Sequence, residues 1–376
     1  MPTEPATCPH RPPCPGCPRW GEPGIAPAAA EKLRGIAREA GIMAPTVHSG
    51  SALTFRHRAR LMVRGRSASP KVGIFQTSSH RIADIPRCRV HHPLVNRVAA
   101  ALRRTARETG LQPYADRPHV GHLRSVQIVV ERGSQTAQVV VVANARIPGS
   151  TLALLDRLTD ELGRDLHSLW WNGNPARTNT ILGPHWHHCT GPEFVREQIG
   201  SASVFFPPGA FGQSHLELAD AMVELVQGWV PDGAHIAELH AGCGSFGLGL
   251  LRRASRVVFN ERSEHASRGL ERGIAERPPD ERNRAWIARG AAADRLDILG
   301  GADVGIVDPP RRGLEPEVIA GLVRARPTRL IYVSCEPDAL RRDLEALVRG
   351  GFRLAALEAF DCFPYTEHIE SVALLN

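Results

Sequence analysis

From about Ser203 onward the chain alternates short apolar segments with segments of helical pattern, and this alternation limits the possible folds more than any other feature. The apolar segments are HIAEL, RVVFN, DVGIVD and RLIYV, with helices expected after Gly247, after RVVFN and over Asp338–Val348. A Gly350–Gly351 pair closes the last helix, and two strand-like segments follow, around Arg353–Ala359 and Ile369–Leu375. This order predicts an α/β domain over residues 201–376, built on a doubly wound parallel sheet with ligands at the carboxyl ends of its strands.

Residues 1–200 show a different pattern. The alternation of apolar and basic residues in FRHRARLMVRG indicates a half-buried strand, and VQIVVE and AQVVVVAN also indicate strands. Helices are expected near Ala28–Ala40, over Leu94–Thr109 and over Leu152–Leu162. We therefore predict an α+β domain with a substantial antiparallel sheet, preceded by a Pro- and Cys-rich arm over residues 1–27.

The charge of the chain is unevenly distributed. Residues 1–200 contain 26 Lys/Arg and 14 Asp/Glu, whereas residues 201–376 contain 20 and 25. Between Ser51 and Arg107 there are 13 basic residues and one acid, Asp84, and the whole chain has only two lysines. Because the planar guanidinium group matches phosphate and base edges, this segment favours binding to a polyanion, although a solvated surface rich in arginine remains open.

The 376-residue length and the sparse cysteines limit the class of protein. A chain of this length can form two domains, each with its own core. No apolar run reaches the length of a membrane span, and the first residues lack a basic segment followed by an apolar one. We therefore expect a cytoplasmic protein without a membrane partner, in which clustered cysteines bind metal or take part in chemistry.

A glycine-rich loop follows the strand HIAEL. Its sequence, His240-Ala-Gly242-Cys-Gly244-Ser245-Phe-Gly, allows close approach of the backbone to a nucleotide, and Glu261 ends the next strand, where it could accept hydrogen bonds from a ribose. A dinucleotide-dependent dehydrogenase has the same pattern. Glu238, just before the glycines, favours a cationic sulfonium cofactor, because a pyrophosphate would be repelled by nearby carboxylates.

Reactive side chains follow the next two strands. Asp308-Pro-Pro-Arg comes after DVGIV, Cys335 comes after RLIYVS, and Glu370 lies near the carboxyl terminus. The segments VDPPRRGL, YVSCEPDALRRDL and DCFPYTEHIESVALL, with FGQ at 211–213, closely resemble the RNA uracil-5-methyltransferase family in order and spacing over nearly the whole chain. The resemblance implies a Rossmann-like class I methyltransferase domain that uses S-adenosylmethionine.

The resemblance also implies roles for these residues. Carbon 5 of uracil is a poor nucleophile until a thiolate adds to carbon 6, and a base must then remove the carbon-5 proton. The family pattern makes Cys335 the nucleophile and Glu370 the base, with Phe211 as a stacking surface for a flipped-out uracil and with Gln213 and Asp308 as polar contacts. It implies a cofactor site at the following residues: Gln213, Glu238, His240, Gly242, Gly244, Ser245, Glu261 and Asp308.

The chain departs from the family pattern at four positions. The family usually has an aromatic residue at His240, Asn at Ser245, Asn at His215 and an acid near Gly290, on the adenine side. These departures leave the type of reaction unchanged and put the affinity for the cofactor in question.

Four cysteines form a candidate metal site: Cys8, Cys14, Cys17 and Cys88. Their spacing alone fits zinc and an iron–sulfur cluster about equally well. The resemblance favours a structural [4Fe–4S] cluster, because family members that modify ribosomal RNA carry one on this arrangement. It also implies the short form of the family, without the amino-terminal β-barrel of some relatives.

The layout is most similar to that of enzymes that form 5-methyluridine in 23S ribosomal RNA, and no obligate protein partner is implied. Transfer RNA is the main alternative substrate. A non-catalytic RNA-binding or assembly factor would keep the basic segment but would tolerate the loss of Cys335. A nicotinamide-dependent oxidoreductase is a more distant alternative, and it would bind a dinucleotide.

Overall fold

The computed structural model describes residues 7–22 and 24–376, so the first six residues of the predicted arm and Pro23 lie outside it. The segment from which the absence of a secretory signal was predicted, residues 1–17, begins with six residues outside this range. The chain forms two compact units, which we call the front unit (Met1–Gly21 with Ser51–Val195) and the catalytic unit (Glu22–Gly50 with Arg196–Asn376). Within residues 7–22 and 24–376, no helix has both the length and the apolar character needed to cross a membrane.

The catalytic unit contains an eight-stranded sheet in the order β1-β16-β17-β15-β14-β11-β12-β13. The five strands from β15 to β13 are parallel, and β17 runs antiparallel between β15 and β16. The strands span the following residues: β1 Thr46–His48, β11 His235–Leu239, β12 Arg256–Glu261, β13 Ala285–Arg289, β14 Val304–Val307, β15 Arg329–Ser334, β16 Leu354–Phe360 and β17 Glu370–Leu375. The predicted doubly wound sheet is therefore confirmed, and its order reverses between β11 and β14, where ligands of such sheets bind.

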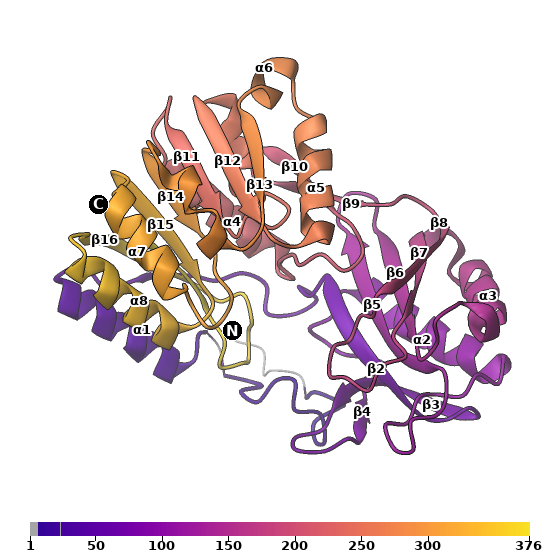
Figure 1. The fold of residues 1–376 in the computed structure, drawn as a ribbon. Helices are drawn as coiled ribbons and strands as arrows, with labels where there is room; N and C mark the ends of the chain where they lie inside the picture. The colour runs from indigo at the N-terminus through magenta and orange to yellow at the C-terminus, as the bar shows by residue number, and fades with distance from the viewer. Residues whose placement is uncertain (1–6, 23) are drawn as a thin grey trace. The chain divides into compact units, whose positions relative to one another are not determined.

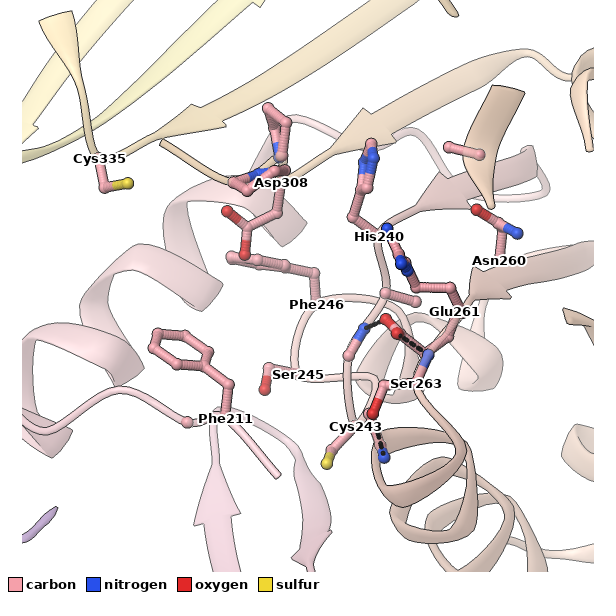
Figure 2. A pocket seen from close by; sticks show the side chains of 18 of the residues that line it. Phe211, His240, Cys243, Ser245, Phe246, Asn260, Glu261, Ser263, Asp308 and Cys335 are labelled. Atoms are coloured by element: carbon pink, nitrogen blue, oxygen red, sulfur yellow. Dashed lines mark hydrogen bonds between the residues drawn. The ribbon is translucent and has the colours of Figure 1, made fainter. Parts of the chain in front are cut away.

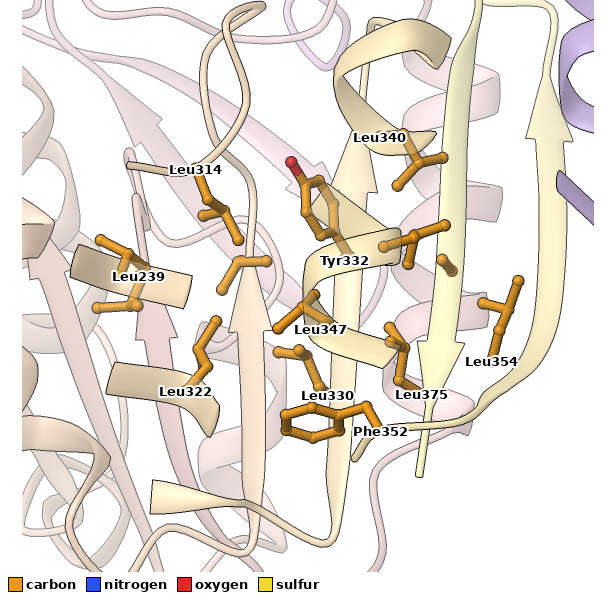
Figure 3. Packing of buried hydrophobic residues seen from close by; sticks show 14 of the residues in the cluster. Leu239, Leu314, Leu322, Leu330, Tyr332, Leu340, Leu347, Phe352, Leu354 and Leu375 are labelled. Carbon is orange, nitrogen blue, oxygen red and sulfur yellow. The ribbon is translucent and has the colours of Figure 1, made fainter. Parts of the chain in front are cut away.

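Helices lie around this sheet, and a hairpin of two strands forms a small sheet of its own (Figure 1). They are α1 Pro27–Ala40, α4 Leu216–Gly228, α5 Glu264–Ala275, α6 Pro279–Arg282, α7 Pro316–Ala325 and α8 Pro337–Arg349, with the hairpin strands β9 Val195–Ile199 and β10 Ala202–Phe206. Apolar residues of α1, α7 and α8 pack on one face of the sheet around Tyr332, Leu330 and Leu347 (Figure 3). Burial of each such leucine stabilises the folded state by about 1.5–3 kcal/mol. This packing holds in place the strands whose ends carry the site.

Residues 22–50 join the catalytic unit, whereas a single boundary near residue 200 was predicted. Strand β1 pairs in parallel with β16, and Lys32 of α1 lies 2.7 Å from Asp338 of α8. Leu33 and Ile36 of α1 are buried in the same core as α8. The apolar face of α1 was visible in the sequence, but the sequence did not show which sheet that face would cover.

The helix expected after Gly247 is a short 3-10 helix, Leu248–Arg252. Only a few residues separate Gly247 from the start of β12 at Arg256, which leaves no room for an α-helix of ordinary length. The helix expected after RVVFN is present as α5, and the one expected over Asp338–Val348 is present as α8.

The front unit is built on a seven-stranded sheet in the order β4-β3-β2-β5-β6-β7-β8, antiparallel except for the β6–β7 pair. Its elements are β2 Arg58–Arg66, β3 Ser69–Phe75, β4 Ile82–Asp84, α2 Pro93–Glu108, β5 Leu123–Glu131, β6 Thr136–Ala143, α3 Leu152–Leu162, β7 Leu166–Gly173 and β8 His185–Thr190. Residues of α2 and α3 share one core with the sheet. The predicted α+β architecture is confirmed.

Candidate active site

A cavity of about 620 Å³ opens at the carboxyl ends of the central strands of the catalytic unit. Figure 2 shows part of its lining, including Phe211, His240, Ser245, Glu261, Asp308 and Cys335. It brings together most of the residues that the sequence predicted, namely Phe211, Gln213, His240, Gly242, Ser245, Glu261, Asp308, Cys335 and Glu370. Glu238 and Gly244 are not among the lining residues.

The glycine-rich loop is held by Glu261. One carboxylate oxygen accepts a hydrogen bond from the Gly242 N–H at 2.8 Å, and the other accepts one from the Ser263 N–H at 2.6 Å (Figure 2). Gly242 and Gly244 have φ values of 58° and 84°, and His240, which is not a glycine, has φ 60°. These left-handed conformations favour glycine and explain the residue types at 242 and 244. Because each carboxylate oxygen has a second lone pair, Glu261 can also face a ribose.

Glu238 lies beneath this loop, whereas the sequence predicted that it contacts the cofactor. Its side chain is 1% exposed, and a Cβ added at Gly247 would lie 2.1 Å from its Oε2 atom. Burial, together with the nearby Asp308, raises its pKa well above the ordinary value. The arrangement favours a positioning role, in which Glu238 supports the loop from inside the core.

Part of the cavity is lined by residues that the sequence did not single out: Asn260 within β12, Arg262 directly after β12, and Ala291 and Ala292 after β13. Asn260 Nδ2 donates to the carbonyl oxygens of Ala288 and Gly290, at 2.9 and 3.0 Å, and so fixes the end of β13. The signal that could have identified them is their position at strand ends, but β13 itself was not predicted.

The predicted nucleophile and base lie on neighbouring strands. Ser334 of β15 is paired with Ser371 of β17, so Cys335 and Glu370 follow and precede paired residues at the same end of the sheet. Asp308 directly follows β14, the next strand, and Figure 2 shows Cys335 and Asp308 on the same side of the cavity. Gln213 Nε2 donates to Glu370 Oε1 at 3.3 Å. Phe211, which also lines the cavity, is 72% exposed.

Negative groups are crowded at this end of the cavity. Burial, with the nearby Asp308, raises the pKa of Glu370 to about 8. Burial, with the nearby Glu261, raises the pKa of Asp308 to about 7. Burial, with the charges of Glu370 and Asp308, raises the pKa of the Cys335 thiol to about 11. A positively charged ligand would favour the ionised forms of all three groups.

Arg311 opposes this negative potential and was missed as a site residue. Its charge lowers the pKa of both Cys335 and Glu370, and it lines the cavity. Its position in the motif Asp308-Pro-Pro-Arg could have identified it as a site residue from the sequence. The loop that carries it is anchored to α8, because the buried Asp343 accepts hydrogen bonds from the Leu314 N–H at 2.8 Å and from the Tyr332 hydroxyl at 2.7 Å.

The chain is 33% identical to an uncharacterized RNA methyltransferase of Protochlamydia amoebophila (strain UWE25), over 98% of this chain and 97% of that protein. The chain belongs to the RNA uracil-5-methyltransferase family. The enzyme is also 32% identical to an uncharacterized RNA methyltransferase of Gloeobacter violaceus (strain ATCC 29082 / PCC 7421), over 93% of this chain and 75% of that one.

Two further comparisons agree with this assignment. The family model described as tRNA (Uracil-5-)-methyltransferase matches residues 301–376 of the enzyme, which contain Asp308, Cys335 and Glu370. The fold is similar to that of the Pyrococcus abyssi tRNA (uracil-54, C5)-methyltransferase, a structure in complex with S-adenosyl-L-homocysteine. That similarity has a TM-score of 0.76 and 24% identity, and it covers 93% of this chain and 83% of the other. The predicted Rossmann-like class I fold and methyltransferase activity are thus confirmed.

The four cysteines predicted to bind metal all lie in the front unit. Burial, followed by the charges of Cys88, Cys14 and Cys8, raises the pKa of Cys17 to about 12, so the four thiols are within electrostatic reach of one another. Backbone N–H groups of Val90 and His91 face the sulfur of Cys88. Nevertheless, residues 7–22 and 24–376 contain no group of three or more His, Cys, Asp or Glu side chains arranged to hold a metal ion. The predicted metal site therefore gains no support beyond the proximity of the thiols.

Proposed function

We propose that the enzyme methylates carbon 5 of a uridine in RNA through a covalent bond between Cys335 Sγ and carbon 6 of the uracil. The observation that carries this proposal is the placement of Cys335, Glu370 and Asp308 at adjoining strand ends in one cavity. A thiol and a carboxyl group side by side match the two requirements of the reaction, which are activation of carbon 5 and removal of its proton.

The residues act in order. The Cys335 thiol releases its proton to solvent and the thiolate adds to carbon 6. The electron pair of the 5,6 double bond makes carbon 5 nucleophilic, so that carbon 5 can form a bond to the methyl group. S-adenosylmethionine supplies the methyl group when it is bound. Glu370, as the carboxylate, then takes the proton from carbon 5, and the 5,6 double bond re-forms as the Sγ–carbon 6 bond breaks and returns the electron pair to sulfur. Arg311 is placed to favour the thiolate, and Gln213 holds the Glu370 carboxylate.

The residues around the cavity fit S-adenosylmethionine. Glu261 faces the loop at which a ribose would bind, and Asp308, with the buried carboxyl groups nearby, favours a positive sulfonium over a pyrophosphate. His240, Ser245 and Gly242 line the same wall. Phe211, exposed at the rim, offers a flat surface on which a flipped-out uracil can stack.

The proposed substrate is 23S ribosomal RNA, because the resemblance links the arrangement of the four cysteines to family members that modify ribosomal RNA. Transfer RNA is the second candidate, because the matching family model and the Pyrococcus abyssi structure are both named for transfer RNA. The two candidates share the mechanism and differ only in the RNA that is recognised. An experiment that separates the RNA pools therefore decides between them.

The test is nucleoside mass spectrometry on separated ribosomal and transfer RNA from cells that lack the gene. These cells are complemented with the wild type, with Cys335→Ala or with Cys189→Ala, the control, in which the cysteine changed lies in the front unit. We expect 5-methyluridine to return with the wild type and the control, and not with Cys335→Ala. Full restoration by Cys335→Ala would overturn the covalent mechanism, and restoration in transfer RNA alone would change the substrate.

We further propose that Cys8, Cys14, Cys17 and Cys88 hold a structural [4Fe–4S] cluster. The proximity of the thiols supports this, as do the backbone N–H groups that face the sulfurs of Cys14 and Cys88. A four-iron cube separates its thiolates more widely than one zinc ion does, so the lack of a single-ion arrangement weighs more against zinc. Iron, sulfide and zinc would be measured in anaerobically purified protein. Stoichiometric zinc without sulfide would overturn the proposal.

A further inference from the structure

Three loops of the front unit form a continuous edge, which we call the three-loop rim (residues 76–81, 115–120 and 175–181). His80 Nδ1 lies 3.6 Å from Asp116, which joins the first loop to the second. His119 Nε2 lies 3.1 Å from the carbonyl oxygen of Pro175, and Arg177 donates to the carbonyl oxygen of Pro118 at 3.2 Å. These contacts join the second loop to the third, so segments far apart in sequence present one surface.

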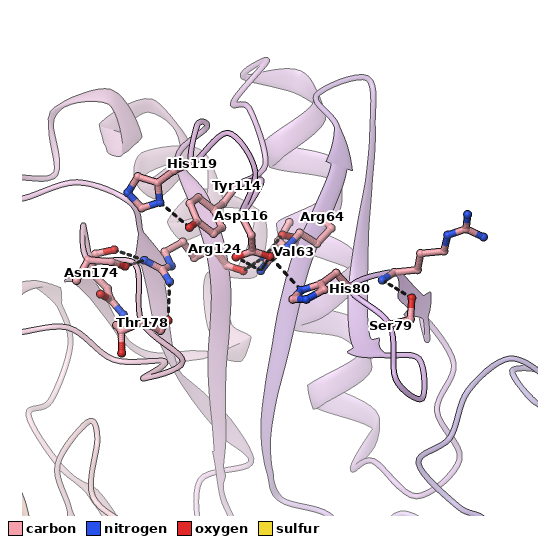
Figure 4. Close-up of polar contacts among 12 residues, drawn as sticks. Val63, Arg64, Ser79, His80, Tyr114, Asp116, His119, Arg124, Asn174 and Thr178 are labelled. Atoms are coloured by element: carbon pink, nitrogen blue, oxygen red, sulfur yellow. Dashed lines mark hydrogen bonds and ion pairs between the residues drawn. The ribbon is translucent and has the colours of Figure 1, made fainter.

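Arg124 is the residue that shapes this rim. It is the extra residue at a β-bulge in β5, where the pairing register with β6 shifts between Leu123 and Ser125. Its guanidinium donates to the carbonyl oxygens of Asn174, Ala176 and Thr178, at 2.6, 2.8 and 3.3 Å (Figure 4). The third loop is therefore wrapped around a buried guanidinium that binds three of the loop's carbonyl oxygens.

A second arginine fixes the other side of the rim. Arg64 lies over the ring of Tyr114 at 5.1 Å, and Arg124 lies over the same ring at 4.5 Å. Arg64 also donates to Asp116 at 3.3 Å, and the Tyr114 hydroxyl lies 2.7 Å from His119 Nδ1 (Figure 4). Asp116, the one acid of the rim, is thus engaged by Arg64 and faces His80. It is therefore not paired with the exposed arginines, which stay available for a phosphate.

The exposed charge of the rim is one-sided. The three loops contain Arg81, Arg117 and Arg177, all exposed, and one acid, Asp116. Among the residues that the structure describes, none of these three arginines forms an ion pair with an acid. Thr178, Asn179 and Thr180 add exposed hydrogen-bonding groups to the third loop.

The helical face of the front unit provides the contrast. Arg97, Arg104 and Arg157 are also exposed, but each is paired with an acid: Asp165, Glu161 and Glu108 respectively. These three arginines of the helices are therefore neutralised by acids, whereas the three arginines of the rim have no acid partner within the part of the chain that the structure describes. Free guanidinium groups on a preformed surface are the arrangement that phosphate backbones require.

We propose that the three-loop rim is a docking surface for the sugar–phosphate backbone of the substrate RNA, outside the catalytic cavity, with Arg81, Arg117 and Arg177 as the phosphate contacts. This inference rests on the proposed function only in taking RNA as the partner. Because contacts with phosphate carry no sequence information, the rim contributes affinity and orientation, and the choice of uridine is made elsewhere.

The test uses the full-length protein and a fluorescein-labelled RNA hairpin, whose binding is followed by anisotropy over a series of KCl concentrations. The variant is the triple change Arg81→Gln, Arg117→Gln and Arg177→Gln. The matched control is Arg97→Gln, Arg104→Gln and Arg157→Gln, which removes the same charge from the helical face. The logarithm of the association constant falls linearly with the logarithm of the salt concentration. We expect this negative slope to become shallower by about 2–3 in the rim variant, since each lost phosphate contact removes about 0.7–0.9 from its magnitude. The control should keep the wild-type slope.

Two further measurements separate the possible outcomes. A triple Arg→Lys rim variant should keep most of the slope, because charge alone satisfies a phosphate, and thermal melting checks that all variants are folded. An unchanged slope in the rim variant, or an equal loss in the helical control, overturns the proposal. If the wild type binds RNA with the expected slope but forms no methylated uridine, the rim stands and the proposed function fails. If the wild type methylates uridine but the rim changes leave the salt dependence of RNA binding unaltered, the proposed function stands and the docking proposal fails.

Discussion

The side-chain amide of Gln213 donates to the carboxylate of Glu370 at 3.3 Å, although the two residues are 157 positions apart in the chain. The contact joins the segment before α4 to the first residue of β17. It also opposes the rise in the pKa of Glu370 that is caused by burial and by Asp308. The orientation and the ionisation of the proposed base therefore depend on a residue from a distant part of the sequence.

The rate of methylation should rise with pH. Glu370 acts only as the carboxylate, and its pKa is about 8, so kcat/KM for RNA should rise steeply as the pH approaches this value. Above pH 8 the rate should keep rising, but less steeply, towards the pKa of about 11 of the Cys335 thiol, which must also be ionised. Saturation with S-adenosylmethionine should move the midpoint downward, because the sulfonium charge favours the ionised carboxyl. Gln213→Leu should move the midpoint upward, because it removes the hydrogen bond that favours the carboxylate. Initial rates over a pH series check all three directions, and a profile independent of pH would contradict this assignment of the base.

Glu370→Gln should stabilise the protein at alkaline pH. The folded-state pKa of about 8 lies above the ordinary value of 4.5, so the folded protein retains a proton that the unfolded chain releases. The contribution of Glu370 to stability is therefore lost as the pH rises from about 4.5 to 8, whereas glutamine does not ionise. We expect the Tm of the variant to exceed that of the wild type at pH 9 by more than at pH 5. A difference that does not change with pH would show that Glu370 keeps an ordinary pKa.

Gly247→Ala should destabilise the catalytic unit by about 1–3 kcal/mol, as overpacking does. The new Cβ would lie 2.1 Å from Glu238 Oε2 and 2.5 Å from the ring of Phe259. The loop above Glu238 must then shift, so affinity for S-adenosylmethionine should fall as well. Gly228→Ala is the control, since a Cβ added at this last residue of helix α4 meets no atom within 4 Å. We expect it to stabilise the protein by less than about 1 kcal/mol. Urea denaturation and calorimetric titration measure the two effects, and equal stabilities of the two variants would contradict the supporting role of Glu238.

The anchor of the loop 311–314 on α8 can be tested through Asp343 and Tyr332. Tyr332→Phe removes one hydrogen bond and should cost about 1 kcal/mol, whereas Asp343→Ala also leaves the Leu314 N–H unpaired and should cost about 3 kcal/mol. Because the loop carries Arg311, Asp343→Ala should also lower kcat. A double-mutant cycle in urea checks the coupling, which should be smaller than the cost of Asp343→Ala alone. Additive losses would show that the two side chains act independently.

Local patterns in the sequence were sufficient for most of the catalytic unit. The parallel strands were predicted because both faces of such strands are buried and their sequences are continuously apolar. Asp308 and Cys335 could be placed together because carboxyl ends of neighbouring parallel strands meet at one edge. Strand β13 was missed, since its sequence, AWIAR, is short and ends in a charged residue at the edge of the sheet.

The tertiary structure alone decided what depends on contacts between distant segments. It assigned α1 to the catalytic unit, because the apolar face of a helix can be read from the sequence but the surface that covers it cannot. It placed Glu238 under the glycine loop, where a carboxylate next to a glycine motif could equally have faced the cavity. It also separated paired from free arginines, because composition counts charges, whereas only the fold brings acids such as Glu161 and Asp165 beside some arginines and leaves Arg81, Arg117 and Arg177 without them.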